Sequence, residues 1–209
     1  MNVLLDRLPD SVEICGQAVP IDTNFYTGII FEEMVVDDDL SDGEKIETAL
    51  RLYFGDNVRF VGIDAVMEAI DKIMWFYSCG KPKETGNEAE ELGKIVFSYE
   101  HDAEYIYQAF MSAYQIDLRE EKVHWWKFRA LFKALPDTTQ FMKIVGYRSV
   151  KITSKMSKDE KAFYQKMKRL FALPKDGAHG NSDSKLQAEL EEALRNGDTA
   201  ALMEQIGRR

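Results

Sequence analysis

The sequence predicts a mainly α-helical protein with a single helical domain, a small N-terminal β-hairpin and a short helical C-terminal tail. Apolar residues recur at the i, i+3, i+4 spacing of an amphipathic helix along most of the chain. Two S-x-x-E capping boxes mark helix starts, whereas the convincing strand signal is confined to one short stretch. We therefore expect a helical domain over residues 1–173, a linker over 174–184 and a tail over 185–209.

The hairpin and a first helix are expected at the N-terminal end. Two short apolar runs at 12–15 and 18–21 flank Gly16-Gln17, which is the pattern of a two-residue hairpin turn. Thr23 then stands where an N-cap residue would begin a helix over about 25–34.

The next two helices carry clear boundary signals. Ser41 and Glu44 form a capping box, and the apolar residues behind it follow the helical spacing up to Gly55. A third helix is expected over about 64–78, with Gly80 ending it.

Further helices are expected in the second half of the chain. One carries apolar residues between 105 and 114, and the next runs over about 119–135 until Pro136. Asp137 is the expected cap of a shorter helix that ends at Gly146.

A last core helix and an amphipathic tail complete the expected elements. The helix opens with the capping box of Ser157 and Glu160. The segment 174–184 has the polar, glycine-containing composition of a linker, and a thin leucine stripe in 185–209 predicts the helical tail. The apolar residues that we expect the last core helix to bury are Phe163, Met167, Leu170 and Phe171.

Charge is distributed very unevenly along the chain. Residues 1–118 hold 8 Lys and Arg against 24 Asp and Glu, whereas residues 119–174 hold 14 against 5. A net charge of −9 repels nucleic acid at long range, so a nucleic-acid partner is not favoured. We expect the basic segment to pack beside the acidic one, in the same chain or in a neighbouring copy, and a homo-oligomer is therefore predicted.

The sequence offers no catalytic, metal-binding or cofactor-binding set of residues. His101, His124 and His179 lie far apart, and none has a second ligand at the helical spacing of a metal pair. His101-Asp102 matches the core of a metal-dependent phosphohydrolase signature, but Asp102 is better explained as a helix N-cap. Phosphate-binding glycine loops and a nucleophile elbow are also missing. We expect no cofactor and no enzyme activity.

The expected compartment is the cytoplasm. No apolar run reaches the roughly 18–20 residues that span a bilayer, and the first residues do not form a secretory signal. Two cysteines, Cys15 and Cys79, do not make a disulfide framework.

One block of aromatic and basic residues, HWWKFRAL at 124–131, has several interpretations. Trp125 and Trp126 are adjacent, so on a helix their rings point about 100° apart. One ring can enter the core while Trp126, with Arg129 beside it, faces a protein partner. Both rings can instead lie in a wide helical core, or they can stack on nucleic-acid bases.

The same block carries a family resemblance. The segments SYEHDAEYIYQAF, AYQIDL, VHWWKFRALFKALP and DTTQFMKIVGYR resemble the bacteriophage gene-product-fifteen family, which is found in the tail-gene modules of long-tailed phages and prophages. The resemblance covers most of residues 1–173.

The resemblance implies a role in tail assembly in the host cytoplasm. It suggests a chaperone that binds the long, apolar tape-measure protein before the tail tube polymerises around it. The alternatives are a structural or connector component of the tail and a nucleic-acid-binding protein that uses residues 119–174. The candidate partner-binding residues are Trp126, Arg129 and Tyr147, supported by methionines that adapt to irregular partners.

Overall fold

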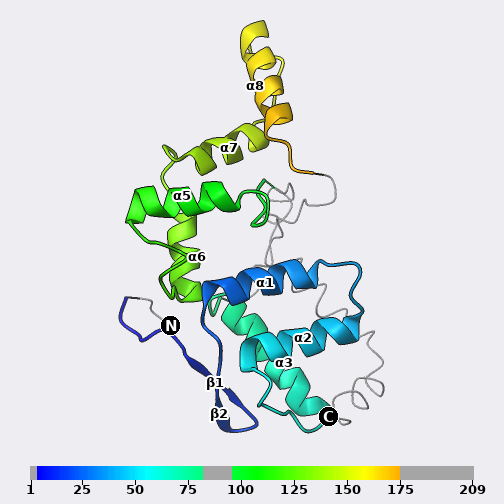
Figure 1. The fold of residues 1–209 in the computed structure, drawn as a ribbon. Coiled ribbons are helices and arrows are strands. Elements are labelled where there is room, and N and C mark those ends of the chain that lie inside the picture. The colour runs from blue at the N-terminus through cyan, green and yellow to red at the C-terminus, as the bar shows by residue number, and fades with distance from the viewer. Residues whose placement is uncertain (1–3, 82–95, 175–209) are drawn as a thin grey trace. The chain divides into compact units, whose positions relative to one another are not determined.

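The computed structural model describes residues 4–81 and 96–174, and within these it contains seven helices and one two-stranded sheet (Figure 1). The predicted mainly helical fold with an N-terminal hairpin is therefore confirmed. The described residues fall into two compact units: unit 1 comprises 4–81 and 123–128, and unit 2 comprises 96–122 and 129–174. The predicted tail and nearly all of the predicted linker lie outside the described residues, and the division into one domain and a tail stays a prediction.

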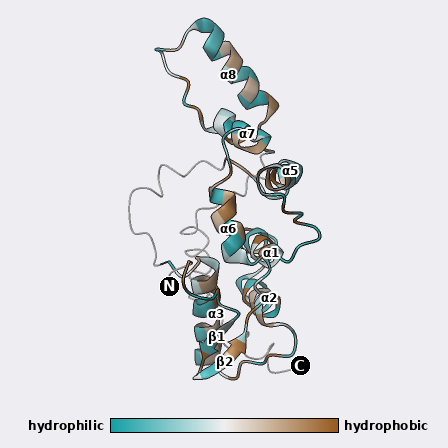
Figure 2. Cartoon of the chain, turned by 90° about the vertical axis from the view of Figure 1, so that its left-hand side faces the viewer, coloured by the Kyte–Doolittle hydropathy of each residue, from teal (hydrophilic) through white to brown (hydrophobic). Residues whose placement is uncertain are grey.

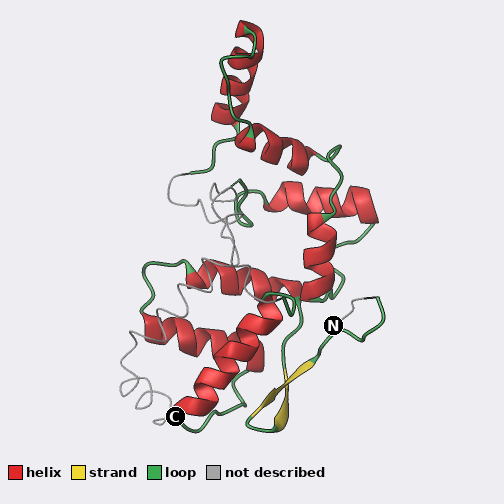
Figure 3. Ribbon diagram, turned by 180° about the vertical axis from the view of Figure 1, so that it is seen from behind, coloured by secondary structure: helices red, strands yellow, loops and turns green. Residues whose placement is uncertain are grey.

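The hairpin of unit 1 consists of the antiparallel strands β1 (Ser11–Ile14) and β2 (Gln17–Pro20), drawn in yellow in Figure 3. The strands lie one residue earlier than predicted because the turn is made by Cys15 and Gly16. Both turn residues have positive φ, at 49° and 73°, as a type I′ hairpin turn requires. Gln17, which we had expected in the turn, is the first residue of β2.

Three helices pack around an aromatic core in unit 1. They are α1 (Phe25–Val35), α2 (Asp42–Phe54) and α3 (Ile63–Tyr77). Helix α2 packs against both α1 and α3, and β1 packs against α3. The rings that meet at centroid separations of 5.2–6.0 Å are fully buried, and they are those of Phe31, Tyr53, Phe76, Tyr77 and Trp125.

The capping boxes that the sequence indicated are both present. Ser41 and Glu44 exchange hydrogen bonds at the start of α2, as do Ser157 and Glu160 at the start of the last described helix. For two other helices, those that begin near residues 25 and 140, the cap is a different residue from the predicted one.

The first shifted cap is Asn24, which has an extended backbone and accepts a hydrogen bond from the Tyr26 N–H, in place of the predicted Thr23. The carbonyl of Thr23 accepts a hydrogen bond from the Trp125 N–H at 2.7 Å instead. Thr139, rather than Asp137, caps the helix that follows Pro136.

Unit 2 contains α5 (Ala103–Tyr114), α7 (Gln140–Ser149), α8 (Lys158–Leu170) and the later part of α6 (Trp125–Lys133). Helix α7 packs against both α5 and α8. Four rings from three segments meet at centroid separations of 5.2–6.0 Å: Phe97, Tyr99, Phe132 and Phe141.

Helix α6 begins later than the sequence predicts. We expected a helix from about Arg119, but α6 starts at Trp125. Gln115 ends α5 in the left-handed conformation, and the Asp117 carboxylate accepts a hydrogen bond from the Arg119 N–H at 2.9 Å. This aspartate turn competes with helical hydrogen bonding, so residues before 125 form a loop.

The prediction that α8 is a core helix is wrong, because none of its residues is buried. Phe163 is 47% exposed and Leu170 is 65% exposed. Tyr147 of α7 stacks on Phe171 and meets the edge of Phe163, each at 6.0 Å between ring centroids, and thus covers only part of the apolar face. Periodicity identified a real apolar face, but it does not specify what lies over it.

The contact between α1 and Trp125 gives a stability prediction. Gly28 lies on α1 inside the core, and a Cβ atom placed there would sit 2.5 Å from the Trp125 ring. We expect Gly28→Ala to lower the free energy of unfolding by about 1–3 kcal/mol through overpacking, measured by urea denaturation. Gly146 on α7 has open space around the same position, so Gly146→Ala should stabilise by about 0.5–1 kcal/mol. Equal effects of the two substitutions would contradict this packing.

Candidate functional site

Trp125 and Trp126 are both buried in unit 1, so the prediction that Trp126 faces an exposed surface is corrected. Trp126 is 3% exposed. Its indole N–H donates to the Phe76 carbonyl at 2.7 Å, and the Trp125 indole N–H donates to the Tyr77 carbonyl at 2.9 Å. These carbonyls stand in the last turn of α3, beyond its regular i→i−4 hydrogen bonds, and the Phe76 carbonyl also accepts a hydrogen bond from the Cys79 N–H at 3.0 Å. The two indoles therefore cap α3 from about 50 residues further along the chain.

The physical reason for the correction is that ring-bearing residues surround both indoles. Trp125 stacks against Tyr77 at 5.3 Å and Phe128 at 5.8 Å between centroids. Trp126 meets Trp75 at 5.5 Å and Phe76 at 5.9 Å. The two rings do point in different directions, as the angle of about 100° between adjacent helix positions predicts, but both rings lie in the core of unit 1.

His124, next to this pair, holds the N-terminal segment. The Trp126 N–H donates to His124 Nδ1 at 3.0 Å, which places the ring proton on Nε2. Nε2 then donates to the Pro9 carbonyl at 3.0 Å. Burial lowers the pKa of His124 below its usual 6.5, against the opposing effects of the Pro9 hydrogen bond and the Asp10 charge. The site thus favours a neutral imidazole.

The other two candidate partner-binding residues lie in unit 2. Arg129 is half-buried on α6, and Tyr147 is half-buried on α7, where it packs against Phe163 and Phe171 as described above. Tyr147 therefore supports α8, and its own exposed area is limited. Of the three predicted residues, Trp126 is thus buried in unit 1, and Arg129 and Tyr147 are half-buried in unit 2.

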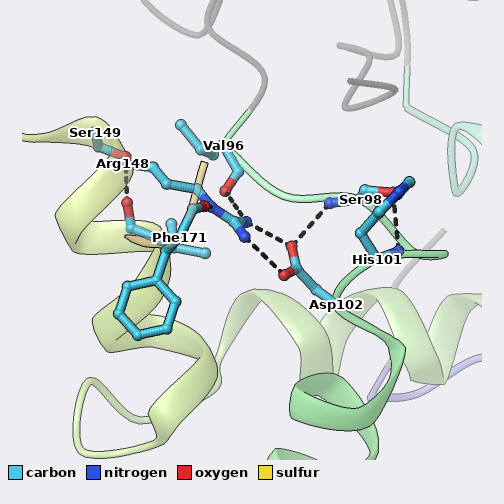
Figure 4. Close-up of polar contacts among 8 residues, drawn as sticks. Val96, Ser98, His101, Asp102, Arg148, Ser149 and Phe171 are labelled. Atoms are coloured by element: carbon cyan, nitrogen blue, oxygen red, sulfur yellow. Dashed lines mark hydrogen bonds and ion pairs between the residues drawn. The ribbon is translucent and has the colours of Figure 1, made fainter. Parts of the chain in front are cut away.

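A charged cluster that the sequence did not indicate joins three segments of unit 2 (Figure 4). Arg148 donates two hydrogen bonds to the Asp102 carboxylate, at 2.6 and 2.9 Å. It also donates to the carbonyls of Val96 at 3.0 Å and Phe171 at 2.6 Å. The Ser98 N–H donates to Asp102 at 3.0 Å, so both oxygens of this fully buried carboxylate are satisfied.

In this cluster the Asp102 carboxylate of the His101-Asp102 pair is bound by Arg148. Asp102 stands at the N-cap position of α5, as predicted, but its side chain makes no capping hydrogen bond because it binds Arg148 instead. The ring Nδ1 of His101 lies 3.3 Å from the Ser98 hydroxyl. Within residues 4–81 and 96–174, no group of three or more His, Cys, Asp or Glu side chains is placed to hold a metal ion.

Unit 1 has a surface cavity of about 450 Å³ between β1 and α3. One wall is the exposed edge of Trp75, and three carboxylates against one lysine give the lining an acidic character. One of these carboxylates, Glu68, accepts a hydrogen bond from the Cys15 N–H at 2.9 Å. The residues that line the cavity are Ser11, Val12, Glu13, Glu68, Asp71, Lys72 and Trp75.

Large apolar side chains are exposed on several of the described helices and loops. Helix α1 exposes Tyr26 and Ile30, and α8 exposes Phe163 and Leu170. None of the described helices is long and apolar enough to cross a bilayer. The remaining exposed apolar residues of this size are Leu4, Leu5, Val61, Met67, Trp75 and Met111.

Comparison with known proteins gives one match. The chain matches the family model described as Bacteriophage Gp15 protein over residues 4–173. Searches of curated proteins and of solved structures each found no match.

The Arg148–Asp102 pair gives a prediction for unit 2. Arg148→Met leaves the buried Asp102 carboxylate without its cation, and it should lower the free energy of unfolding by about 3–5 kcal/mol. Adding Asp102→Asn removes the stranded charge and keeps an acceptor for the Ser98 N–H, so the double variant should recover part of the loss. Arg7→Met at the exposed Arg7–Asp10 pair is the matched control, and it should change stability by less than about 1 kcal/mol in urea denaturation.

His124 gives a prediction about pH. Because the folded pKa lies below the unfolded value of 6.5, the unfolded chain binds the proton first as the pH falls. The stability contributed by neutral His124 should be complete above about pH 6.5 and decline below it, toward the lowered folded pKa. Urea denaturation between about pH 7.5 and pH 5.5 should show a flatter profile for His124→Gln than for wild type. Parallel profiles would show that His124 does not contribute to acid destabilisation.

Proposed function

Because the chain belongs to the Bacteriophage Gp15 protein family, we propose that it acts in phage tail assembly by binding another protein and not as an enzyme. The family match over residues 4–173 carries the phage assignment. The finer proposal is that it is a chaperone of the tape-measure protein, working in the cytoplasm of the host cell. The resemblance to tail-module proteins suggests this partner, and the exposed apolar surface of the molecule supports a protein partner.

The outward face of α1 is the surface that best fits such a partner. Helix α1 carries apolar residues on both faces, and of its two charged residues Glu32 is buried whereas Glu33 is exposed. A helix of this kind is normally covered on all sides. Tyr26 is nevertheless 50% exposed and Ile30 is 42% exposed, and they lie one turn apart on the same face.

The chemistry of a tape-measure protein matches this face. Before the tail tube forms, such a long helical chain exposes apolar stripes that would otherwise aggregate. Burying side chains such as Tyr26 and Ile30 against a stripe contributes on the order of 1.5–3 kcal/mol per large apolar residue. A partner helix with apolar residues at i and i+4 would lie along α1 in the helix-in-groove manner.

Co-expression with the tape-measure protein of the same phage tests the proposal. Wild-type protein should keep the tape-measure protein soluble and co-purify with it, because binding lowers the free concentration of aggregation-prone chain. Moderate salt should weaken this complex little, since apolar burial drives it.

Two variants place aspartates on different surfaces. Tyr26→Asp with Ile30→Asp on α1 should abolish co-purification, whereas Met111→Asp on α5 should leave it intact. Both proteins should keep the helical circular dichroism signal of wild type. If the tape-measure protein aggregates equally with and without wild-type protein, the chaperone proposal fails. Recovery of the protein from purified virions would favour a structural component of the tail, and binding to DNA that weakens steeply with salt would favour nucleic-acid binding.

A further inference from the structure

Helix α8 has an apolar face that Tyr147 covers only in part, and basic residues stand beside this face. Phe163, Met167 and Leu170 are spaced at i, i+4 and i+7, which places them on one side of the helix. Lys166 and Arg169 are exposed within the same two turns. Figure 2 shows hydrophobic and hydrophilic residues side by side on this helix.

Unit 1 carries a surface of the opposite character. The cavity between β1 and α3 offers the half-exposed ring of Trp75, which is 39% exposed, as an apolar wall. Glu13 and Asp71 are exposed at this cavity, and Glu68 adds a third carboxylate. A volume of about 450 Å³ lies in the range of cavities that receive ligand groups, so one apolar side chain has room to enter.

We propose that α8 of one copy docks into the β1–α3 cavity of a second copy. The apolar residues of α8 pack beside Trp75, and Lys166 and Arg169 pair with Glu13 and Asp71. Charge complementarity identifies a second copy as the occupant. The segment 119–174 that contains α8 has 14 cations against 5 anions, and residues 1–118, which contain the cavity, have 8 against 24.

The symmetry of this contact has a consequence for assembly. The contact is heterologous, because it joins two different surfaces and not one surface to itself. A pair therefore retains one unoccupied α8 on one copy and one unoccupied cavity on the other. Association continues head to tail until a ring closes or a filament forms. The contact also goes beyond the tape-measure proposal, which uses the outward face of α1.

Sedimentation velocity of the full chain at increasing concentration tests the proposal. Wild type should associate reversibly beyond a dimer, and raising the ionic strength should weaken the association because exposed charges are screened. Lys166→Glu with Arg169→Glu on α8 should raise the dissociation constant at least roughly tenfold. Glu13→Lys with Asp71→Lys at the cavity should do the same, and this variant spares Glu68, which binds the Cys15 N–H.

Mixing the two charge-reversed proteins gives the decisive result. The α8 variant still has a native cavity and the cavity variant still has a native α8, so the mixture should associate although neither protein does so alone. Circular dichroism and thermal unfolding of each variant should match wild type, since all four positions are exposed. Met111→Asp, at an exposed position on α5, should leave association unchanged.

Three outcomes would overturn the proposal. One is a wild-type protein that stays monomeric at low ionic strength and at concentrations of about 100 μM, well above the dissociation constants of specific contacts. Another is association that both variants retain. The third is a mixture that stays dissociated, which would mean that α8 and the cavity do not bind each other. None of these measurements involves a tape-measure protein, so their failure is separate from failure of the proposed function.

Discussion

The hydrogen bonds from two adjacent indoles to the end of α3 are the constraint on which unit 1 depends. Trp125 and Trp126 donate to the carbonyls of Tyr77 and Phe76, which are about 50 positions earlier in the chain. Through these bonds the segment 123–128 returns to unit 1 and completes its aromatic core. Gly28 leaves room for the Trp125 ring, and His124 extends the same anchoring to Pro9. One short block thus joins the N-terminal segment, α1 and α3.

Unit 2 is also held together by polar contacts between residues far apart in the sequence, but here the donor is a charged guanidinium group and not an indole. Arg148 binds the Asp102 carboxylate and the carbonyls of Val96 and Phe171, so it joins the start of α5, the segment before it and the end of α8. Lys168 of α8 adds a hydrogen bond to the Arg148 carbonyl at 2.6 Å. Because this ion pair is buried, each charged group needs the other to offset the free energy that it loses on leaving water. The cluster positions α8 through its C-terminal end and leaves much of its apolar face exposed.

Because these anchoring contacts are made by buried side chains, the surfaces of the two units remain available for binding. With Trp125 and Trp126 engaged in the core of unit 1, the large apolar residues that the described chain exposes are on α1, α3, α5 and α8 and in loops. Two of these surfaces differ in charge as well as in place: the cavity beside Trp75 is acidic and the face of α8 is basic. The two proposed contacts use separate surfaces: the face of α1 for the tape-measure protein, and α8 with the cavity for a second copy.

The sequence alone determined the helical architecture, the hairpin and the family, because each depends on local signals. In the two capping boxes, Ser41 and Ser157 form hydrogen bonds with the glutamate three positions later, so the local sequence is enough to locate these boxes. Only the tertiary structure decided that Trp126 is buried, that Asp102 binds Arg148 and that the face of α8 is open. Periodicity states which residues share a face of a helix, whereas burial depends on what covers that face. For Trp126 the cover comes from α3, about 50 residues away, and for Asp102 from α7, 46 residues away; no local pattern encodes either distance.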